Sequence, residues 1–201
     1  DHTGYFPRLV QAGYRGPAYC TAATQALLAL LLPDSGHLQE EEAFYAQRRG
    51  YSKHKSPRPL YTEADARACL GRLRAVPWLE PVPVARGIEA TWLPSGHILG
   101  AGSIVLRAEG VTVVFSGDVG RADDALMPAP TLLPPSDLLV MESTYGDREH
   151  PDSDAEAVLG DCIRAVASRG GVLLIPAFAV GRAQLLTLLV SRLRARGAIP
   201  D

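Results

Sequence analysis

Apolar residues recur at helical spacing near the start of the chain. The segment TAATQALLALLL, residues 21–32, predicts a strongly apolar helix with Thr21 as its N-cap and Pro33 at its end. Residues 38–50 predict a second helix, in which acidic residues come early and basic residues late. This order favours a helix because it complements the helix dipole.

A third helical pattern covers residues 61–76, YTEADARACLGRLRAV. Thr62 and Asp65 have the spacing of a capping box at its start, where each side chain bonds the other's backbone N–H. The first third of the chain is therefore expected to be helical.

The middle of the chain, residues 81–118, has the pattern of a strand meander. Short runs rich in β-branched residues alternate with Gly, Pro and Glu-Gly turns. The segment SIVLRAEGVTVVF, residues 103–115, predicts a hairpin.

The last third alternates between strand and helix patterns. Its four segments are 138–144 (strand), 151–171 (helix), 172–179 (a buried strand) and 181–197 (helix). Ser153 and Glu156 have capping-box spacing at the start of the first of these helices. An alternation of this kind predicts parallel strands joined by right-handed crossovers.

Composition and charge are those of an ordinary globular protein. The chain has 201 residues, 47% of them hydrophobic and 21% charged, and its net charge is −2. No apolar run approaches the length of a membrane span, and the start lacks the pattern of a signal peptide. Three cysteines without a CxxC motif suggest buried thiols in a reducing cytoplasm. The charge does not point to nucleic acid, although a local basic patch would suffice for binding.

Four polar positions are candidates for catalysis or metal binding because they adjoin predicted strands or helices. His97 lies in a Gly-rich loop between strands, Asp118 and Glu142 follow strands, and the pair Asp1 and His2 precedes a helix. Such loops are where enzymes display catalytic groups, and histidine with aspartate suits zinc. Each residue also has an ordinary structural interpretation. Asp118 could be a turn residue, His97 a hydrogen-bonded loop residue, and Glu142 a cap or an ion-pair partner.

Taken in order, these segments resemble one known family. The stretches DHTG, PSGHILGAGS, VFSGDVGR, ESTYGDREH and IPAFAVGRAQ are similar to those of metallo-β-lactamase-fold hydrolases of the β-CASP group. That group comprises RNA-processing nucleases, including bacterial ribonuclease J and the endonuclease of mRNA 3′-end formation. The resemblance extends over essentially the whole chain, and it includes the helical stretch 34–66, which is similar to that of bacterial and archaeal members.

The resemblance implies an α/β fold: a metallo-β-lactamase αββα sandwich lacking its N-terminal strands, with the start of an inserted β-CASP domain. The expected division is residues 1–146 for the first domain and 147–201 for the second. The family's metal motif is H-x-H-x-D-H, of which only the final Asp-His, Asp1 and His2, stands in this sequence. The chain is therefore expected to be an internal fragment that, expressed alone, is inactive.

The resemblance also implies two zinc ions and a role for each residue. His97 matches a ligand of one zinc, Asp1 and His2 match ligands of the other, and Asp118 matches the carboxylate that bridges both. Catalysis is expected from Asp1, Asp118 and Glu142. Glu142 is placed near the leaving group, beside a later histidine.

Three further residues are candidates for substrate binding. His150 lies in ESTYGDREH, with a solvated loop histidine as the alternative. Gly181 and Arg182 open a helix whose backbone N–H groups could hold a phosphate, with capping and packing of Phe178 as the alternative. The basic run 48–58 could contact phosphates or be a solvated loop beside three glutamates.

The resulting hypothesis is a zinc-dependent ribonuclease, endonucleolytic, 5′-exonucleolytic or both, that acts on single-stranded RNA in the cytoplasm. DNA is an alternative substrate because the family has DNA-acting members. A homodimer is a further expectation, and no membrane partner is expected. Two alternatives remain at this point. One is a non-catalytic RNA-binding scaffold of the same family, and the other is a metallo-hydrolase of a small ester, thioester or lactam.

Overall fold

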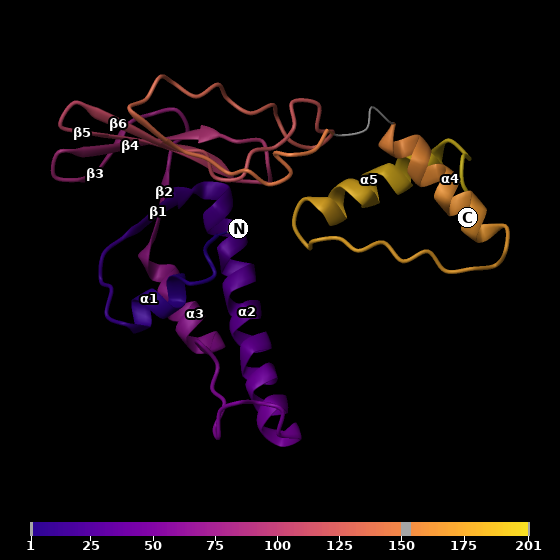
Figure 1. Ribbon diagram of the computed structural model, residues 1–201, viewed down its shortest axis with the longest axis horizontal. Coiled ribbons are helices and arrows are strands. Elements are labelled where there is room, and N and C mark those ends of the chain that lie inside the picture. Colours follow the sequence, from indigo (N-terminus) through magenta and orange to yellow (C-terminus); the bar gives the residue numbers. More distant parts are fainter. Residues whose placement is uncertain (1, 150–153, 201) are drawn as a thin grey trace.

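The chain forms a mixed α/β structure, seen in a computed structural model that describes residues 2–149 and 154–200 (Figure 1). The helices are α1 (Phe6–Gln11), α2 (Ala22–Arg49), α3 (Glu63–Cys69), the short 3₁₀ helix η1 (Leu70–Arg72), α4 (Ala155–Ala167) and α5 (Arg182–Ala195). The strands are β1 (Ala18–Thr21), β2 (Leu73–Val76), β3 (Val82–Ala85), β4 (Ile88–Pro94), β5 (Gly102–Ala108), β6 (Val111–Phe115) and β7 (Leu138–Val140).

Helix α2 is one continuous helix, so the prediction of two helices separated at Pro33 is wrong. Thr21 is the N-cap as predicted, and its hydroxyl accepts a hydrogen bond from the Thr24 backbone N–H at 3.2 Å. Pro33 is buried inside the helix. A proline there removes one backbone hydrogen bond, and tertiary packing offsets that cost. Gly36 supplies part of this packing, because a Cβ at Gly36 would lie 2.7 Å from the backbone nitrogen of Glu63 in α3.

Helix α3 begins with the predicted capping box. The Thr62 hydroxyl accepts from the Asp65 N–H at 3.1 Å, and the Asp65 carboxylate accepts from the Thr62 N–H at 3.0 Å. The helix ends at Cys69, however, and Leu73–Val76 forms strand β2, so the prediction of helix to residue 76 is wrong there. Strand β2 pairs in parallel with β1. The two strands are far apart in the sequence, so local periodicity cannot predict this pairing.

The predicted meander is confirmed as a sheet in the order β3-β4-β5-β6-β7. Strands β3 to β6 are antiparallel, and β7 joins β6 in parallel. The predicted hairpin is β5–β6, and Glu109 and Gly110 form its turn with φ of 50° and 81°. Positive φ at both residues is typical of the two-residue turns that match strand twist.

The core is divided between the helices and the sheet. Leu28 and Leu32 of α2 pack with Tyr61 and with Cys69 of α3, all almost inaccessible to solvent. Two further buried clusters comprise Val76 of β2 and residues of the five-stranded sheet: Ala90, Trp92, Leu93, Val105 and Val114. The two parts meet where β1 leads into α2, so the N-terminus of α2 is fixed against the sheet.

Helices α4 and α5 pack against each other, with Leu193 of α5 against Gly160 of α4. The N-cap of α4 is Asp154, whose carboxylate accepts from the N–H groups of Glu156 and Ala157; the predicted cap Ser153 lies outside the described residues. Residues 172–179 form no strand, contrary to prediction. Within the described residues no strand lies beside them to supply ladder hydrogen bonds, so the expected parallel crossover is absent there.

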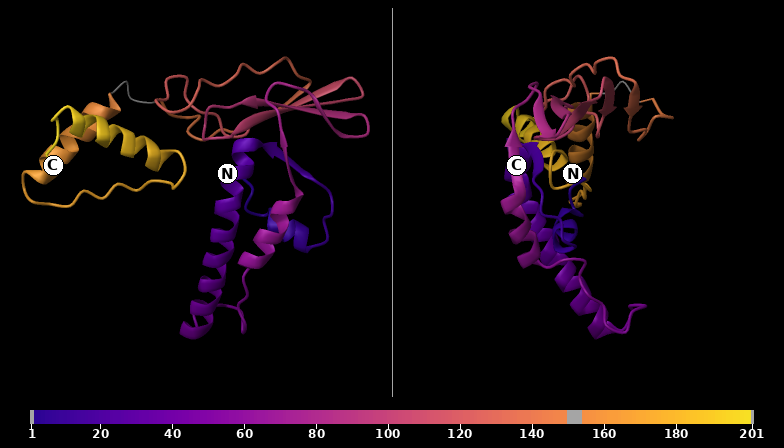
Figure 2. Two further views of the ribbon diagram at one scale, coloured as in Figure 1. Left: turned by 180° about the vertical axis from the view of Figure 1, so that it is seen from behind. Right: turned by 90° about the vertical axis from the view of Figure 1, so that its left-hand side faces the viewer.

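The views agree on how these parts are arranged (Figures 1 and 2). Helix α2 projects away from the five-stranded sheet with α1 and α3 beside it, and its C-terminal end lies farthest from the sheet. The pair α4–α5 lies to one side, beyond the loop that follows β7. In the described part of the chain, no helix combines the length and apolarity that crossing a membrane requires.

Candidate metal centre

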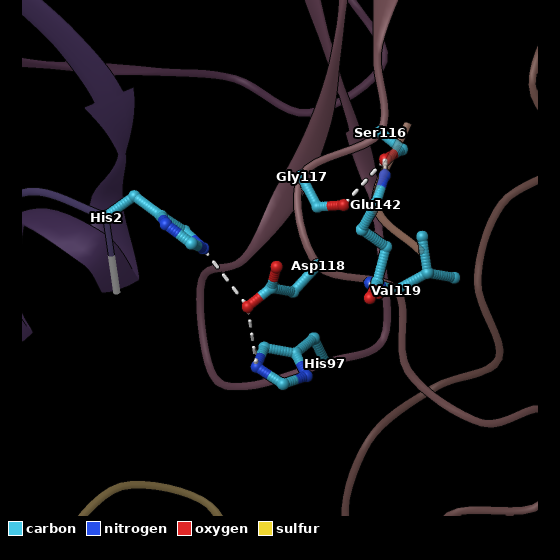
Figure 3. Close-up of polar contacts among 7 residues, drawn as sticks. All are labelled: His2, His97, Ser116, Gly117, Asp118, Val119 and Glu142. Atoms are coloured by element: carbon cyan, nitrogen blue, oxygen red, sulfur yellow. Dashed lines mark hydrogen bonds and ion pairs between the residues drawn. The ribbon is translucent and has the colours of Figure 1, made fainter. Parts of the chain in front are cut away.

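His2, His97 and Asp118 come together from three distant segments of the chain (Figure 3). His2 precedes α1, His97 lies in the β4–β5 loop, and Asp118 follows β6. The Oδ2 atom of Asp118 lies 3.1 Å from Nε2 of His2 and 3.5 Å from Nε2 of His97. The two imidazoles approach that one oxygen from different directions.

The loop that carries His97 is held by α2. The hydroxyls of Thr21 and Thr24 both donate to the carbonyl of Gly100, at 2.8 and 3.0 Å. Gly100 has φ of +87°, and a Cβ there would lie 2.5 Å from the Thr24 nitrogen. Glycine is therefore required for both the conformation and the close approach. The N-cap of α2 thus also positions the His97 loop.

The loops of His97 and Asp118 are joined directly through their backbones. The Gly120 N–H donates to the Ser95 carbonyl at 2.8 Å. A Cβ on Gly120 would lie 1.9 Å from the carbonyl oxygen of Gly96. Only glycine fits here, and the contact sets the position of Asp118 relative to His97.

Glu142 supports the Asp118 loop through the backbone. Its Oε1 accepts a hydrogen bond from the Val119 N–H at 2.6 Å, and its own N–H donates to the Ser116 hydroxyl at 3.1 Å. The Ser116 hydroxyl donates to the Gly117 carbonyl at 2.7 Å, and the Ser103 hydroxyl donates to the Ser116 carbonyl at 2.7 Å. This network connects the end of β7 to the residues on either side of Asp118 (Figure 3).

A pocket of about 240 Å³ adjoins these side chains. His2, Asp118 and Ser95 line its polar side, and α2 and the sheet supply apolar walls that include Leu28 and Trp92. Ser95 is 1% exposed, and its hydroxyl has no hydrogen-bond partner within the described residues. A buried hydroxyl of this kind at a pocket is suited to a bound water or ligand oxygen.

The donor chemistry of the three side chains fits zinc. Imidazole nitrogen and carboxylate oxygen are zinc ligands, and two ligands of one tetrahedral zinc lie roughly 3.3 Å apart. The separations at Asp118 match that value. Yet the described residues contain no group of three or more His, Cys, Asp or Glu side chains that could hold a metal ion by themselves. A metal ion here would need ligands in addition to these three.

The remaining predicted residues are distributed differently. Asp1 and His150 lie outside the described residues. Gly181, at the start of α5, is near the His97 loop, since a Cβ there would lie 2.9 Å from Cγ2 of Ile98. The N–H groups of Arg182 and Ala183 donate to the carbonyls of Val180 and Phe178, so these two donors are not available to an anion at this helix start.

Sequence reasoning did not identify Ser95, Ser103, Ser116 or Thr24, and it assigned Thr21 only to capping. Ser116 and Ser95 stand immediately beside the glycines of SGD and SGH, which was the available signal. The Ser103 and Thr24 hydroxyls donate to the distant Ser116 and Gly100 carbonyls, and the Ser116 hydroxyl accepts from the distant Glu142 N–H. No local pattern reports those contacts.

The comparisons with known proteins point in one direction. Ribonuclease TTHA0252 of Thermus thermophilus is 34% identical over 185 residues, which is 92% of this chain and 39% of that protein. Cleavage and polyadenylation specificity factor 73 of Drosophila melanogaster is 31% identical over 193 residues, 94% of this chain and 26% of that protein. Transcription termination factor FttA of Methanocaldococcus jannaschii is 31% identical over 196 residues, 94% of this chain and 29% of that protein.

The chain belongs to the metallo-β-lactamase-fold β-CASP family. No protein-family model matches it. The chain spans 39% of the length of the bacterial relative and less than a third of the other two. The family resemblance seen in the sequence motifs is thus confirmed, and His2, His97 and Glu142 from three of those motifs lie around the Asp118 loop.

Proposed function

We propose that the protein is a metal-dependent hydrolase that cleaves phosphodiester bonds of single-stranded RNA. The observation that carries this proposal is the convergence of His2 and His97 on Asp118 beside a pocket. The relatives that match most of this chain include proteins named as a ribonuclease and as endoribonucleases, which supports RNA as the substrate. In the same proposal, residues 1–146 are part of a metallo-β-lactamase sandwich, and residues 147–201 begin a β-CASP domain.

We assign the proposed metal centre to two zinc ions, with ligands from Asp1, His2, His97 and Asp118. Bound zinc would act as a Lewis acid and lower the pKa of a coordinated water to about 7. His2 and His97 would present Nε2 atoms, and the approach of both to one Asp118 oxygen supports a bridging role for that carboxylate. Asp118 is held for this task by the Glu142 and Gly120 contacts.

Substrate handling would fall to groups around the pocket. Glu142 would orient or supply the proton for the departing oxygen, from a carboxylate already fixed by the Val119 N–H. His150 and the Arg182 side chain are assigned to RNA contacts, with the backbone of Gly181 beside the His97 loop. The apolar wall of the pocket would exclude water from one side of the reacting group.

The first prediction tests Asp118. The intact gene product is incubated with end-labelled single-stranded RNA and zinc, beside Asp118→Ala. Loss of the carboxylate that both imidazoles face should reduce cleavage at least about 100-fold, as for other metal-site residues. The matched control is Asp123→Ala, which removes an exposed carboxylate that pairs with Arg121 on the surface. Its cleavage rate should equal that of the parent.

Other results would redirect the proposal. Equal cleavage by Asp118→Ala and the parent would contradict the assignment of the metal centre. Binding of RNA without any cleavage by the parent would support the scaffold function instead. Hydrolysis of small esters with no action on RNA would favour the third hypothesis.

A further inference from the structure

The C-terminal end of α2 carries a second polar surface, remote from Asp118. We define the α2 tip as three aromatic and five basic residues: Phe44, Tyr45, Tyr51, Arg48, Arg49, Lys53, Lys55 and Arg58. All eight are exposed. Figures 1 and 2 show this end of α2 and the connection to α3 projecting away from the sheet. Nothing in the proposed chemistry at Asp118 accounts for this surface.

The α2 tip carries an excess of positive charge. Residues 44–60 contain five Lys or Arg and no Asp or Glu. In the described part of the chain, none of these five cations forms an ion pair. Three glutamates, residues 40–42, precede them in α2, and two of these are engaged elsewhere, while Glu42 lines the groove described below. Glu40 accepts from the Glu63 N–H at the start of α3, and Glu41 faces His37, one turn back along α2. Five positive charges gathered without ion-pair partners in the described residues attract a polyanion.

The aromatic residues of the α2 tip lie in solvent instead of the core. The side chains of Phe44 and Tyr51 are 58% and 60% exposed. Phe44 and Tyr45 are in edge-to-face contact at 5.6 Å, and the Arg49 guanidinium lies over the Tyr45 ring at 5.5 Å. Exposed rings beside cations are the combination that binds single-stranded nucleic acid, because bases stack on the rings while cations contact phosphates.

The tip also offers a formed groove. A concavity of about 290 Å³ lies between α2 and the returning chain, and Tyr51 and Arg58 contribute to its lining. The returning chain is fixed by the Leu60 N–H, which donates to the Gln39 side chain at 3.1 Å. One wall of the groove is therefore α2, and the other is the segment 51–60, which this hydrogen bond joins to the helix.

We propose that the α2 tip binds single-stranded RNA, in a section of the strand away from the bond that is cleaved. This inference rests on the proposed function for the identity of the polymer. The charge complementarity and the exposed rings select a single strand over a duplex, because the bases of a duplex are not available for stacking.

The test measures binding and not cleavage, so it remains informative if the protein does not cleave RNA. Binding of the intact gene product to a labelled single-stranded RNA of 30 nucleotides is followed by fluorescence anisotropy with a chelator present, over a range of salt concentrations. The variant Lys53→Ala/Lys55→Ala/Arg58→Ala should bind at least about tenfold more weakly. The slope of its log binding constant against log salt concentration should be shallower by about 2. Tyr51→Ala should weaken binding of the single strand about fivefold and leave binding of duplex RNA unchanged.

The control removes the same charge elsewhere. Arg86, Arg107 and Arg169 are exposed and lie outside the α2 tip, and the triple alanine variant of these three should retain the parent's affinity. Equal melting temperatures would show that all variants are folded. The proposal is overturned if the tip variant binds RNA as the parent does, which would leave this surface to an acidic protein, or if the control triple variant loses the same affinity.

Discussion

At the scale of single residues, the candidate centre depends on backbone contacts as much as on its polar side chains. Asp118 and His97 are coupled through the contact of Gly120 with Ser95 and Gly96. The Asp118 loop is further fixed by the Glu142 carboxylate on the Val119 N–H. These contacts lead to predictions that separate positioning from chemistry.

Replacing Gly120 should disrupt both loops. In Gly120→Ala, the new methyl group would overlap the Gly96 carbonyl, so we expect a loss of about 3 kcal/mol in the free energy of unfolding and weaker zinc binding. Urea unfolding and zinc titration measure the two effects. Gly71→Ala is the matched control, since a Cβ there meets no atom within 4 Å. A Gly120→Ala protein as stable as Gly71→Ala would contradict the close approach.

Glu142 tests whether one carboxylate serves both structure and reaction. Glu142→Gln keeps an oxygen that can accept from the Val119 N–H, so zinc affinity should stay within about threefold of the parent, whereas Glu142→Ala should lose about tenfold or more. Turnover should fall by at least about 100-fold in both variants if Glu142 handles the proton. A glutamine variant with impaired zinc binding would show that the hydrogen bond requires the charge, and one with normal turnover would remove Glu142 from the reaction.

At the scale of elements, the capping box of α3 links stability to pH. The hydrogen bonds from Thr62 hold the pKa of Asp65 below its usual 3.8, with the backbone N–H as the main cause. A lowered folded-state pKa means that the unfolded chain binds the proton more tightly. The ionised Asp65 carboxylate therefore stabilises the folded state fully above about pH 4, and this stabilisation is lost as pH falls through the folded-state pKa.

This predicts a pH-dependent difference between the parent and Asp65→Asn. Urea unfolding should show the parent as more stable at pH 7, and the difference should shrink as pH falls below 3.8. Thr62→Ala should cost about 1 kcal/mol at pH 7 because the helix loses its N-cap. A difference between parent and Asp65→Asn that is constant from pH 7 to pH 2 would contradict the role of the ionised carboxylate.

The elements also show which parts of the fold the sequence could predict. The caps Thr21 and Thr62, the hairpin at Glu109–Gly110 and the sheet meander depend on neighbouring residues, and these predictions are confirmed. The errors at Pro33 and at Leu73–Val76 have a tertiary cause, since packing against α3 and pairing with β1 outweigh local preference. For the site, motif order predicted that His2, His97 and Asp118 belong together, but the serine and glycine contacts between loops were beyond any local pattern.

At the scale of the whole molecule, the apolar segment 172–178 stands out. Val172, Leu174 and Phe178 are each more than 80% exposed, and the sequence has the composition of a buried strand. An extended apolar segment with unpaired backbone groups is prone to intermolecular pairing. The 201-residue chain expressed alone should therefore self-associate and bind a hydrophobic dye.

The substitution Leu174→Lys should reduce both light scattering and dye binding. Leu132→Lys is the control, because Leu132 is 93% exposed but lies in a Pro-rich loop with no strand pattern. Equal effects of the two substitutions would attribute the association to general hydrophobicity and not to segment 172–178.

Helix α2 connects the two surfaces to which function is assigned. Its N-cap Thr21 is bonded to the His97 loop, and its last turn carries the α2 tip. A helix of 28 residues is about 42 Å long. If RNA occupies both ends, the length of α2 sets the shortest strand that can contact both. A stacked strand rising about 3.4 Å per nucleotide needs roughly a dozen nucleotides to reach from one end to the other. Affinity plotted against oligonucleotide length should then rise in a step near that length, and the step should vanish in the Lys53/Lys55/Arg58 triple alanine variant.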